Sequence, residues 1–518
     1  MTPPLVLAID CSTTAAKALV VDAEGRVMGS GARPLRTASP APRRFEQHAP
    51  DWWSATDAAV RTALAEVQHP QHVTAICVTH QRESFVCLDD DDQPLRPAIL
   101  WMDGRAGSQA ERHGTDRVER LSGKPADITP GLYQLAWLRE HEPRTAAATR
   151  RVVDVHGYLV HAMTGRWVSS TASVDPLALL DVSTGDYHPE LLDIAGLQRE
   201  QLPELVTTGT KLGPLRSEVA EGWGLSDTVQ VVAGLGDGQA AGLGLDVTEP
   251  DTAYLVLGTA VVIGSESTTY APSRAYRSMV SALPGHVTVE TFNSAGTFLP
   301  TWFRREFGPR QLDGAPDPEL ERDAAAVPIG SERLLTLPYW NAAQTPHWDG
   351  RASGMTIGWR SSHGRAHFYR SLLEGIAFEL RLQLDGLEQA RGERVRVIRA
   401  MGGGARSALW TQLLADVFAR PLEVRAEGEV SALGAAAVAL TSAGAFASLR
   451  EAAATLAVTD RVVQPRTDAV AAYAELLPVY RRLYAETRDL LHALHETTTP
   501  DGAPTSPQPI DDPMPEQE

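Results

Sequence analysis

Residues 7–22 read LAIDCSTTAAKALVVD, and residues 253–264 read AYLVLGTAVVIG. Each segment has an apolar run typical of a strand, a turn built from Gly, Ser or Thr, and a second strand-like run. The shared pattern predicts one β-hairpin used twice, with the two turns holding one polyphosphate from opposite sides. Such a duplication indicates two related domains with a nucleotide site between them.

The composition narrows the class of protein. A chain of 518 residues with 43% hydrophobic residues is long enough for at least two domains with full cores. A net charge of -18 argues against nucleic acid and anionic membranes as partners, because both attract basic surfaces. Cys11, Cys77 and Cys87 show no CxxC spacing, which is typical of reduced thiols. With no signal-peptide pattern and no long apolar run, we expect a cytoplasmic protein.

Strand and helix patterns alternate along the chain, which predicts an α/β fold. An amphipathic helix is expected over residues 51–67 and another over 468–495, the latter interrupted at Pro478. The expected strands are 5–9, 17–22, 26–31, 73–78, 84–88, 229–233, 253–257 and 395–399. We predict an N-terminal domain over residues 1–246, a C-terminal domain over 247–495, and a disordered acidic, Pro-rich tail over 496–518.

The first motif is the turn from Asp10 to Thr14, followed by Lys17. Backbone N–H groups and hydroxyls in such a turn can donate to phosphates, and a carboxylate can hold Mg²⁺ directly or through water. The alternative is an Asx-type turn that only closes the hairpin. The similar turn at Gly258 and Thr259 favours the phosphate site.

The second motif, Gly234–Gly242, follows an apolar strand and contains Asp237 between two glycines. An aspartate at the end of a strand can approach a substrate hydroxyl and accept its proton during phosphoryl transfer. The alternative is a helix start with Asp237 as its N-cap.

The third motif, Met401–Ser407, reads MGGGARS between a strand and an amphipathic helix. Glycines there let the backbone approach a nucleotide closely. The segment lacks the dinucleotide-binding GxGxxG context, and the chain has no Walker A sequence. A generic tight turn is the alternative.

The three motifs, in this order and at these separations, resemble the FGGY family of carbohydrate kinases over nearly the whole chain up to about residue 490. The resemblance implies a two-domain actin/hexokinase-like fold, a duplicated ribonuclease-H-like α/β architecture with the active site in a cleft between the domains. It implies ATP and Mg²⁺ as cofactor and metal, and a small sugar or polyol as substrate. It allows a homodimer.

The resemblance also assigns roles to individual residues. It makes Asp237 the general base and places Asp10 and Asp237 near Mg²⁺. The implied nucleotide-binding residues are Ser12, Thr13, Thr14, Lys17, Gly258, Thr259, Gly402, Gly403 and Ser407. Ser12 departs from the family, which usually has glycine at this position.

Acceptor recognition is expected from Gln81, Arg82, Glu83, Asp103, Asp237 and Gln239. An adjacent guanidinium and carboxylate, as in Arg82 and Glu83, can bracket one diol. The alternative for this pair is an exposed ion pair at a strand end. The loop 81–83 resembles glycerol kinases, whereas residues 101–106 and 338–348 resemble pentulose kinases such as xylulokinase. We expect ATP-dependent phosphorylation of a ketopentose such as D-xylulose, giving xylulose 5-phosphate, with a glycerol or polyol kinase as the alternative.

Two other classes share the expected fold. A regulator or chaperone-like ATPase has no need to present Arg82, Glu83, Asp103 and Asp237 together. An exopolyphosphatase-like hydrolase needs a cationic channel for its polyanion, which this acidic chain does not indicate. Both are less favoured than a sugar kinase.

Overall fold

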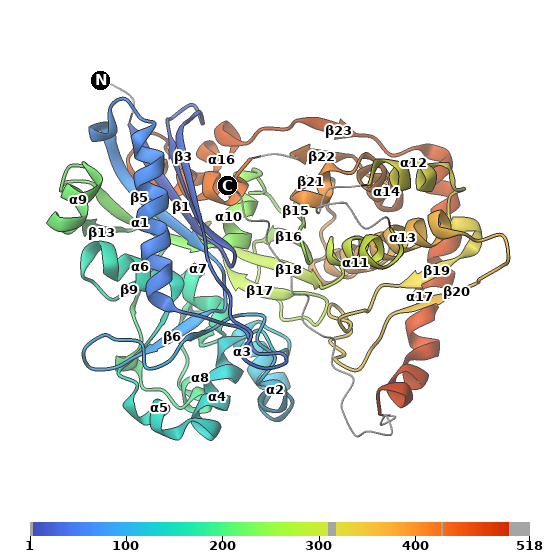
Figure 1. Cartoon of the computed structure of the whole chain (residues 1–518), viewed down its shortest axis with the longest axis horizontal. Coiled ribbons are helices and arrows are strands. Elements are labelled where there is room, and N and C mark those ends of the chain that lie inside the picture. The colour runs from blue at the N-terminus through green and yellow to red at the C-terminus, as the bar shows by residue number, and fades with distance from the viewer. Residues whose placement is uncertain (1–3, 309–316, 426–427, 497–518) are drawn as a thin grey trace.

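The computed structural model describes residues 4–308, 317–425 and 428–496. Apart from Glu496, which ends the last helix, the predicted tail lies outside the described residues. Figure 1 shows two lobes side by side, the first built mainly from the N-terminal part of the chain and the second from the C-terminal part.

The first lobe contains a mixed sheet in the order β13-β14-β5-β1-β2-β3. β1 pairs antiparallel with β2 and parallel with β5, so the chain forms a hairpin and then crosses back to the same sheet. The strands are β1 (Leu5–Cys11), β2 (Ala15–Val21), β3 (Val27–Pro34), β5 (Val73–His80), β13 (Lys211–Pro214) and β14 (Gln230–Gly236).

The second lobe repeats this sheet in the order β17-β18-β16-β15-β21-β22-β23. β15 pairs antiparallel with β16 and parallel with β21, as β1 does with β2 and β5. β17 is an added edge strand. The strands are β15 (Thr252–Leu257), β16 (Val261–Ser267), β17 (Arg277–Val280), β18 (Val287–Asn293), β21 (Val397–Met401), β22 (Leu422–Arg425) and β23 (Arg461–Val463). The predicted duplication is therefore confirmed by the shared topology.

Helices and smaller strands fill the rest of both lobes. The helices of the first lobe are α1 (Ala49–Ala65), α2 (Gly107–His113), α3 (Asp116–Ser122), α4 (Gly131–His141), α5 (Pro143–Ala148), α6 (Val155–Thr164), α7 (Thr171–Val174), α8 (Pro189–Ala195), α9 (Ser217–Trp223) and α10 (Asp237–Gly244). The later helices are α11 (Phe298–Phe307), α12 (Pro318–Ala326), α13 (Arg365–Arg391), α14 (Ala408–Phe418), α15 (Val430–Ser442), α16 (Leu449–Leu456) and α17 (Thr467–Glu496). The smaller strands are β4 (Glu46–Gln47), β6 (Phe85–Leu88), β7 (Ala98–Ile99), β8 (Arg151–Asp154), β9 (Val168–Ser170), β10 (Leu180–Asp181), β11 (Asp186–Tyr187), β12 (Glu204–Val206), β19 (Leu335–Leu337) and β20 (Met355–Ile357).

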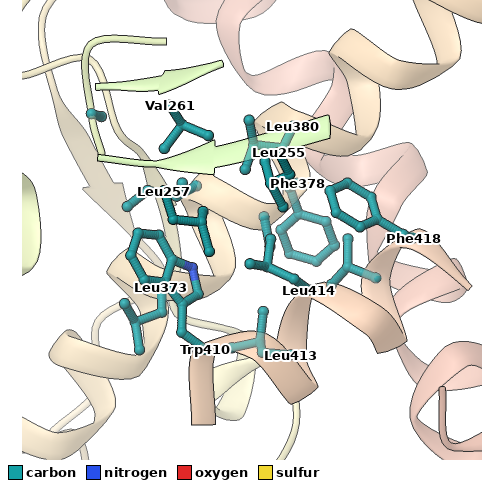
Figure 2. Close-up of a cluster of buried hydrophobic side chains, with 14 of the residues drawn as sticks. Leu255, Leu257, Val261, Leu373, Phe378, Leu380, Trp410, Leu413, Leu414 and Phe418 are labelled. Carbon is teal, nitrogen blue, oxygen red and sulfur yellow. The ribbon is translucent and has the colours of Figure 1, made fainter. Parts of the chain in front are cut away.

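Burial of apolar side chains holds each sheet to its helices. In the second lobe Leu255 and Leu257 of β15 pack with Phe378 of α13 and Leu414 of α14 (Figure 2). In the first lobe Trp52 and other apolar residues of α1 cover one face of the sheet. The opposite face is covered by α15 and α16, which come from the C-terminal part of the chain.

α10 and α15 follow equivalent strands of the two sheets and pack against each other between them. Because α15 shares a core with the first sheet, the two lobes do not correspond to two separate runs of sequence. The boundary near residue 247 stays a prediction. It falls where the chain leaves α10 and enters β15.

One local expectation is wrong. The last helix was expected to be interrupted at Pro478, but α17 runs through this residue. Proline removes one backbone donor, and tertiary contacts hold the helix on both sides of it. Tyr473 donates to Glu374 and Tyr480 donates to Glu379, both on α13.

The contact of α17 with α13 predicts a pH-dependent stability. Glu379 is buried, and its Oε1 accepts hydrogen bonds from the hydroxyls of Tyr339 and Tyr480, at 2.8 and 2.9 Å. Burial raises the pKa of Glu379 to about 7, against the opposing effect of the two phenols. A raised pKa means that the folded state binds the proton of Glu379 more tightly than the unfolded state does. The protonated side chain therefore stabilises the fold at acid pH, and this contribution is lost as pH rises through 7.

Glu379→Gln keeps the acceptor oxygen but removes the charge. We expect the free energy of unfolding of the variant, relative to that of the parent, to increase from pH 5 to pH 8 by up to roughly 3 kcal/mol. Denaturant unfolding at both pH values measures it, with Glu486→Gln on the exposed side of α17 as the control. A difference that does not grow with pH would contradict the prediction.

Candidate functional site

Asp237 is the first residue of α10, directly after β14. Its Oδ1 accepts from its neighbour Gly238 N at 2.8 Å and pairs with Nε of Arg82 at 2.9 Å. The helix has no side-chain cap, and its N-cap position is Gly236. The alternative of Asp237 as the N-cap is therefore wrong. The side chain is 41% exposed while that of Arg82 is only 9% exposed, so the carboxylate remains open to a substrate.

The loop after β5 places Arg82 and Glu83 against the second lobe. Nη1 of Arg82 donates to both oxygens of Glu290 on β18, at 3.0 and 2.9 Å. Oε1 of Glu83 accepts from Nη1 of Arg277 on β17 at 3.0 Å. All four side chains are buried. The alternative of an exposed ion pair at a strand end is wrong, because each charge pairs across the lobes.

The remaining predicted acceptor residues differ in where they lie. Gln81 is buried, and it bonds to Gln47, Thr13 and Ser84 inside the first lobe. The Asp103 carboxylate is fully buried and accepts from Arg105 and from Phe45 N. Gln239 donates to the carbonyls of Ala172 and Val280.

In the first predicted phosphate turn, the hydroxyls of Ser12 and Thr13 form hydrogen bonds within the protein, whereas Thr14 is exposed. Ser12 donates to the carbonyl of Ala15, so its hydroxyl closes the hairpin. Thr13 donates to Gln81 and accepts from Trp101 Nε1. Thr14 is exposed at the tip of the turn. Lys17 forms an ion pair with Glu429 at 2.8 Å and so links β2 to the segment before α15.

The second turn and the glycine motif lie together at the ends of β15 and β21. Thr259 is exposed at the tip of the β15–β16 hairpin. Gly402 has a φ of 94°, and a Cβ there would lie 2.8 Å from the carbonyl oxygen of Leu257, so only glycine fits. Gly403 begins the short 3₁₀ turn that follows. Ser407 caps α14 through Trp410 N, and its hydroxyl donates to Glu321.

Asp10 has the properties expected of a group near a cation. It is buried, and its Oδ1 has no hydrogen-bond partner among the described residues. Burial, followed by the nearby Asp237 carboxylate, raises its pKa to about 7, although Lys17 opposes the shift. A divalent ion between Asp10 and Asp237 would offset the cost of a buried charge on Asp10 and the repulsion between the two carboxylates, so these residues fit Mg²⁺. No group of three or more His, Cys, Asp or Glu ligands occurs in the described part of the chain, so phosphate oxygens or water would complete the coordination.

Sequence reasoning missed the contribution of the second lobe. Glu290 and Arg277 lie opposite each other on β18 and β17, and the Tyr254 hydroxyl donates to Glu290. Lys124 and Asp175 form a further buried ion pair at 2.6 Å, and Asp175 also accepts from Val280 N at the end of β17. The signal in the sequence was a glutamate within the strand pattern VTVETFN. A cavity of about 640 Å³ beside α14 has Glu321, Arg370 and Arg466 among its lining residues. No helix in the described ranges is long and apolar enough to cross a membrane.

Comparison with known proteins gives two adjoining family matches. Residues 5–244 match the N-terminal domain of the FGGY family of carbohydrate kinases, and residues 253–443 match its C-terminal domain. Together these matches cover most of the chain.

Individual relatives are similar along their full length. The xylulose kinase of Escherichia coli is 31% identical over 498 residues, covering 94% of this chain and 100% of the relative. The xylulose kinase of Lactococcus lactis is 29% identical and covers 95% of this chain and 98% of the relative. Among solved structures, a "xyloylose kinase" from Brucella ovis is 28% identical with a TM-score of 0.87, covering 94% of this chain and 100% of that one. A gluconate kinase from Lactobacillus acidophilus has a TM-score of 0.89 at 23% identity, covering 95% of this chain and 100% of that one, which shows the shared fold.

Proposed function

The chain belongs to the FGGY family of carbohydrate kinases, and from this premise we propose that it phosphorylates a ketopentose such as D-xylulose, with Asp237 as the general base. As a member of this family it is a sugar phosphotransferase that uses ATP. The observation that carries the proposal is the half-exposed Asp237 carboxylate beside the buried Arg82 and Glu83. The similarity to xylulose kinases supports the choice of sugar.

In the proposed reaction, Asp237 accepts the proton of the acceptor hydroxyl as its oxygen attacks the γ-phosphorus of ATP. Oδ1 is held by Gly238 N and Arg82, so Oδ2 is the oxygen that takes the proton. Thr14 and Thr259, at the exposed tips of the two hairpins, donate to the phosphates. Mg²⁺, when bound near Asp10 and Asp237, supplies positive charge to the transferred phosphoryl group.

The charges near Asp237 favour a neutral acceptor. Arg82, Lys124 and Arg277 each already pair with a carboxylate of the chain. An acidic sugar would add a carboxylate to a region where Glu83, Asp175 and Glu290 already lie, and this costs free energy. Nε of Arg277, Oδ1 of Asp175 and Oε1 of Gln239 are buried without hydrogen-bond partners in the described residues. Hydroxyl groups, which both donate and accept, can satisfy such atoms.

The acceptor is tested by measuring ADP release at saturating Mg·ATP with D-xylulose, other ketopentoses, glycerol, polyols and D-gluconate. We expect slow ADP release with ATP alone and a many-fold increase with D-xylulose, because kinases restrain transfer to water. Stimulation by glycerol but not by ketopentoses would establish the alternative, which the loop 81–83 favours. ADP release that is indifferent to every acceptor would contradict a sugar kinase.

Replacing Thr14 or Thr259 by Val is expected to raise the KM for ATP by roughly 10- to 100-fold, with a smaller effect on the KM for the acceptor. Each substitution keeps the shape of the side chain but removes one hydrogen bond to a charged phosphate, worth about 1.5 to 3 kcal/mol. Steady-state kinetics with each substrate varied in turn measures the effect. Equal changes in both KM values would show that the exposed tips do not hold ATP.

A further inference from the structure

Four residues form a single row across the second sheet. Tyr254 of β15 lies opposite Gly264 of β16, Gly264 lies opposite Glu290 of β18, and Glu290 lies opposite Arg277 of β17. Directly paired residues of neighbouring strands point to the same face of a sheet. The row therefore presents a phenol, a carboxylate and a guanidinium on one face.

Glycine at position 264 allows Tyr254 to reach Glu290 across β16. A Cβ at Gly264 would lie 2.0 Å from the ring of Tyr254, so the ring occupies the space above this residue. The Tyr254 hydroxyl reaches across β16 in this way and donates to Oε1 of Glu290. Glu290 also accepts from Nη2 of Arg277 at 3.2 Å. All three side chains are buried, which makes their mutual orientation rigid.

The row meets the first lobe at the residues around the proposed base. Glu290 forms an ion pair with the guanidinium of Arg82, and Arg82 in turn forms an ion pair with Asp237. Gly238, next to Asp237, allows this approach: a Cβ there would lie 2.4 Å from Oε1 of Glu290 and 2.7 Å from Nη2 of Arg82. Although burial acts to raise the pKa of Glu290, Arg82 and Arg277 hold it below its ordinary value, so the carboxylate stays charged.

Arg277 makes the second connection. It pairs with Glu83, whose φ of 64° lies in the left-handed region that side chains other than glycine rarely adopt. Thr129 also donates to this carboxylate, at 3.2 Å. A strained conformation of this kind persists only where its surroundings hold it. β17 is itself attached to the first lobe, since Ser278 N donates to Gly123 O at 2.7 Å.

The geometry points to Tyr254, Glu290 and Arg277 as positioning residues for the acceptor, acting across the lobe interface through Arg82 and Glu83. The assignment rests on the proposed function for what the acceptor is. It adds that the lobe carrying the Thr259 hairpin also sets the affinity of the acceptor. Neither Glu290 nor Arg277 needs to touch the sugar, because each fixes a residue, Arg82 or Glu83, that is predicted to bind it.

Glu290→Gln tests this assignment, because it preserves the shape and removes the charge. We expect kcat/KM for D-xylulose to fall by at least about tenfold, mainly through KM, while the KM for ATP stays within about twofold. Arg277→Ala should behave in the same way, and Arg277→Lys should recover part of the loss because one ion pair can still form. Tyr254→Phe, which removes one hydroxyl, is expected to have the same direction with a smaller effect.

Glu374→Gln is a matched control. Glu374 accepts from Tyr473 and pairs with Arg370 in the core of the second lobe, so it reproduces the chemistry of Glu290 away from Asp237. It should lose stability but leave the KM for the acceptor unchanged. If Glu290→Gln behaves like Glu374→Gln, with lower stability and an unchanged acceptor KM, the assignment is overturned. If Glu290→Gln does not fold, Tyr254→Phe and Arg277→Lys decide.

Hydrogen exchange of the unliganded protein separates this inference from the identity of the acceptor. Loss of the Glu290 charge should speed exchange of the backbone amides at residues 81–84, and Glu374→Gln should not. Unchanged exchange there would overturn the positioning role even if D-xylulose is the acceptor. Faster exchange would support it even if another sugar replaces D-xylulose in the kinetic assay.

Discussion

Asp237→Asn is expected to lower the turnover of sugar phosphorylation by roughly 10²- to 10⁴-fold, the range for a positioned general base. An amide has nearly the same shape as the carboxylate but cannot accept the hydroxyl proton. Its carbonyl oxygen can still accept from Gly238 N, so α10 should keep its start. ADP release at saturating ATP and acceptor measures the loss, and titration of the variant with ATP shows whether the nucleotide still binds.

Asp385→Asn is a suitable control, because Asp385 lies on α13 and pairs with Arg381 and Arg481. It should retain the turnover of the parent enzyme. If Asp237→Asn also keeps that turnover, Asp237 has only a structural role at the start of α10.

Arg82→Ala is expected to lower kcat/KM for the acceptor by roughly 10²- to 10³-fold, because the variant lacks the guanidinium that positions the Asp237 carboxylate. Loss of the buried pair with Glu290 should also lower the stability of the fold, by about 3 to 5 kcal/mol. The guanidinium meets Asp237 through Nε and Glu290 through Nη1, so its loss releases both carboxylates at once. Arg82→Lys should have a kcat/KM between those of the parent and Arg82→Ala, since a single ammonium group cannot pair with Asp237 and Glu290 as the guanidinium does.

The measurement is steady-state kinetics with the acceptor varied at saturating ATP, repeated with ATP varied. Arg381→Ala on α13 serves as the control for loss of an ion pair elsewhere. An equal rise in the KM for ATP and for the acceptor would indicate a general disturbance of the lobes and would contradict a specific role of Arg82.

Local patterns in the sequence were enough to identify the repeated hairpin. The strands expected over residues 5–9 and 17–22 appear as β1 and β2, and those over 253–257 and 395–399 appear as β15 and β21. Alternating apolar residues and glycine turns specify such elements because the information lies within a few neighbouring residues. The same local pattern was misleading at Pro478, where packing of α17 on α13 outweighs the missing donor.

The predicted site residues differ in what their side chains contact in the structure. Thr14 and Thr259 lie exposed at equivalent hairpin tips, and Asp237 is open to a substrate beside Arg82. In contrast, hydrogen bonds within their own lobes engage the polar side-chain atoms of Gln81, Asp103 and Ser407. A motif gives the position of a residue in the chain, but the partners of its side chain depend on groups that are distant in sequence.

By itself, the sequence determined the duplicated α/β architecture, the position of Asp237 after a strand, and the two threonine turns, since each follows from short-range backbone preferences. Only the tertiary structure decided how Arg82 and Glu83 are held. Arg82 pairs with Glu290, 208 residues away, and Glu83 pairs with Arg277, 194 residues away. Contacts of this kind form when the second sheet aligns Tyr254, Glu290 and Arg277 in one row and the lobes bury their charges together. The free energy of such buried pairs depends on the geometry of the whole fold, which no local pattern encodes.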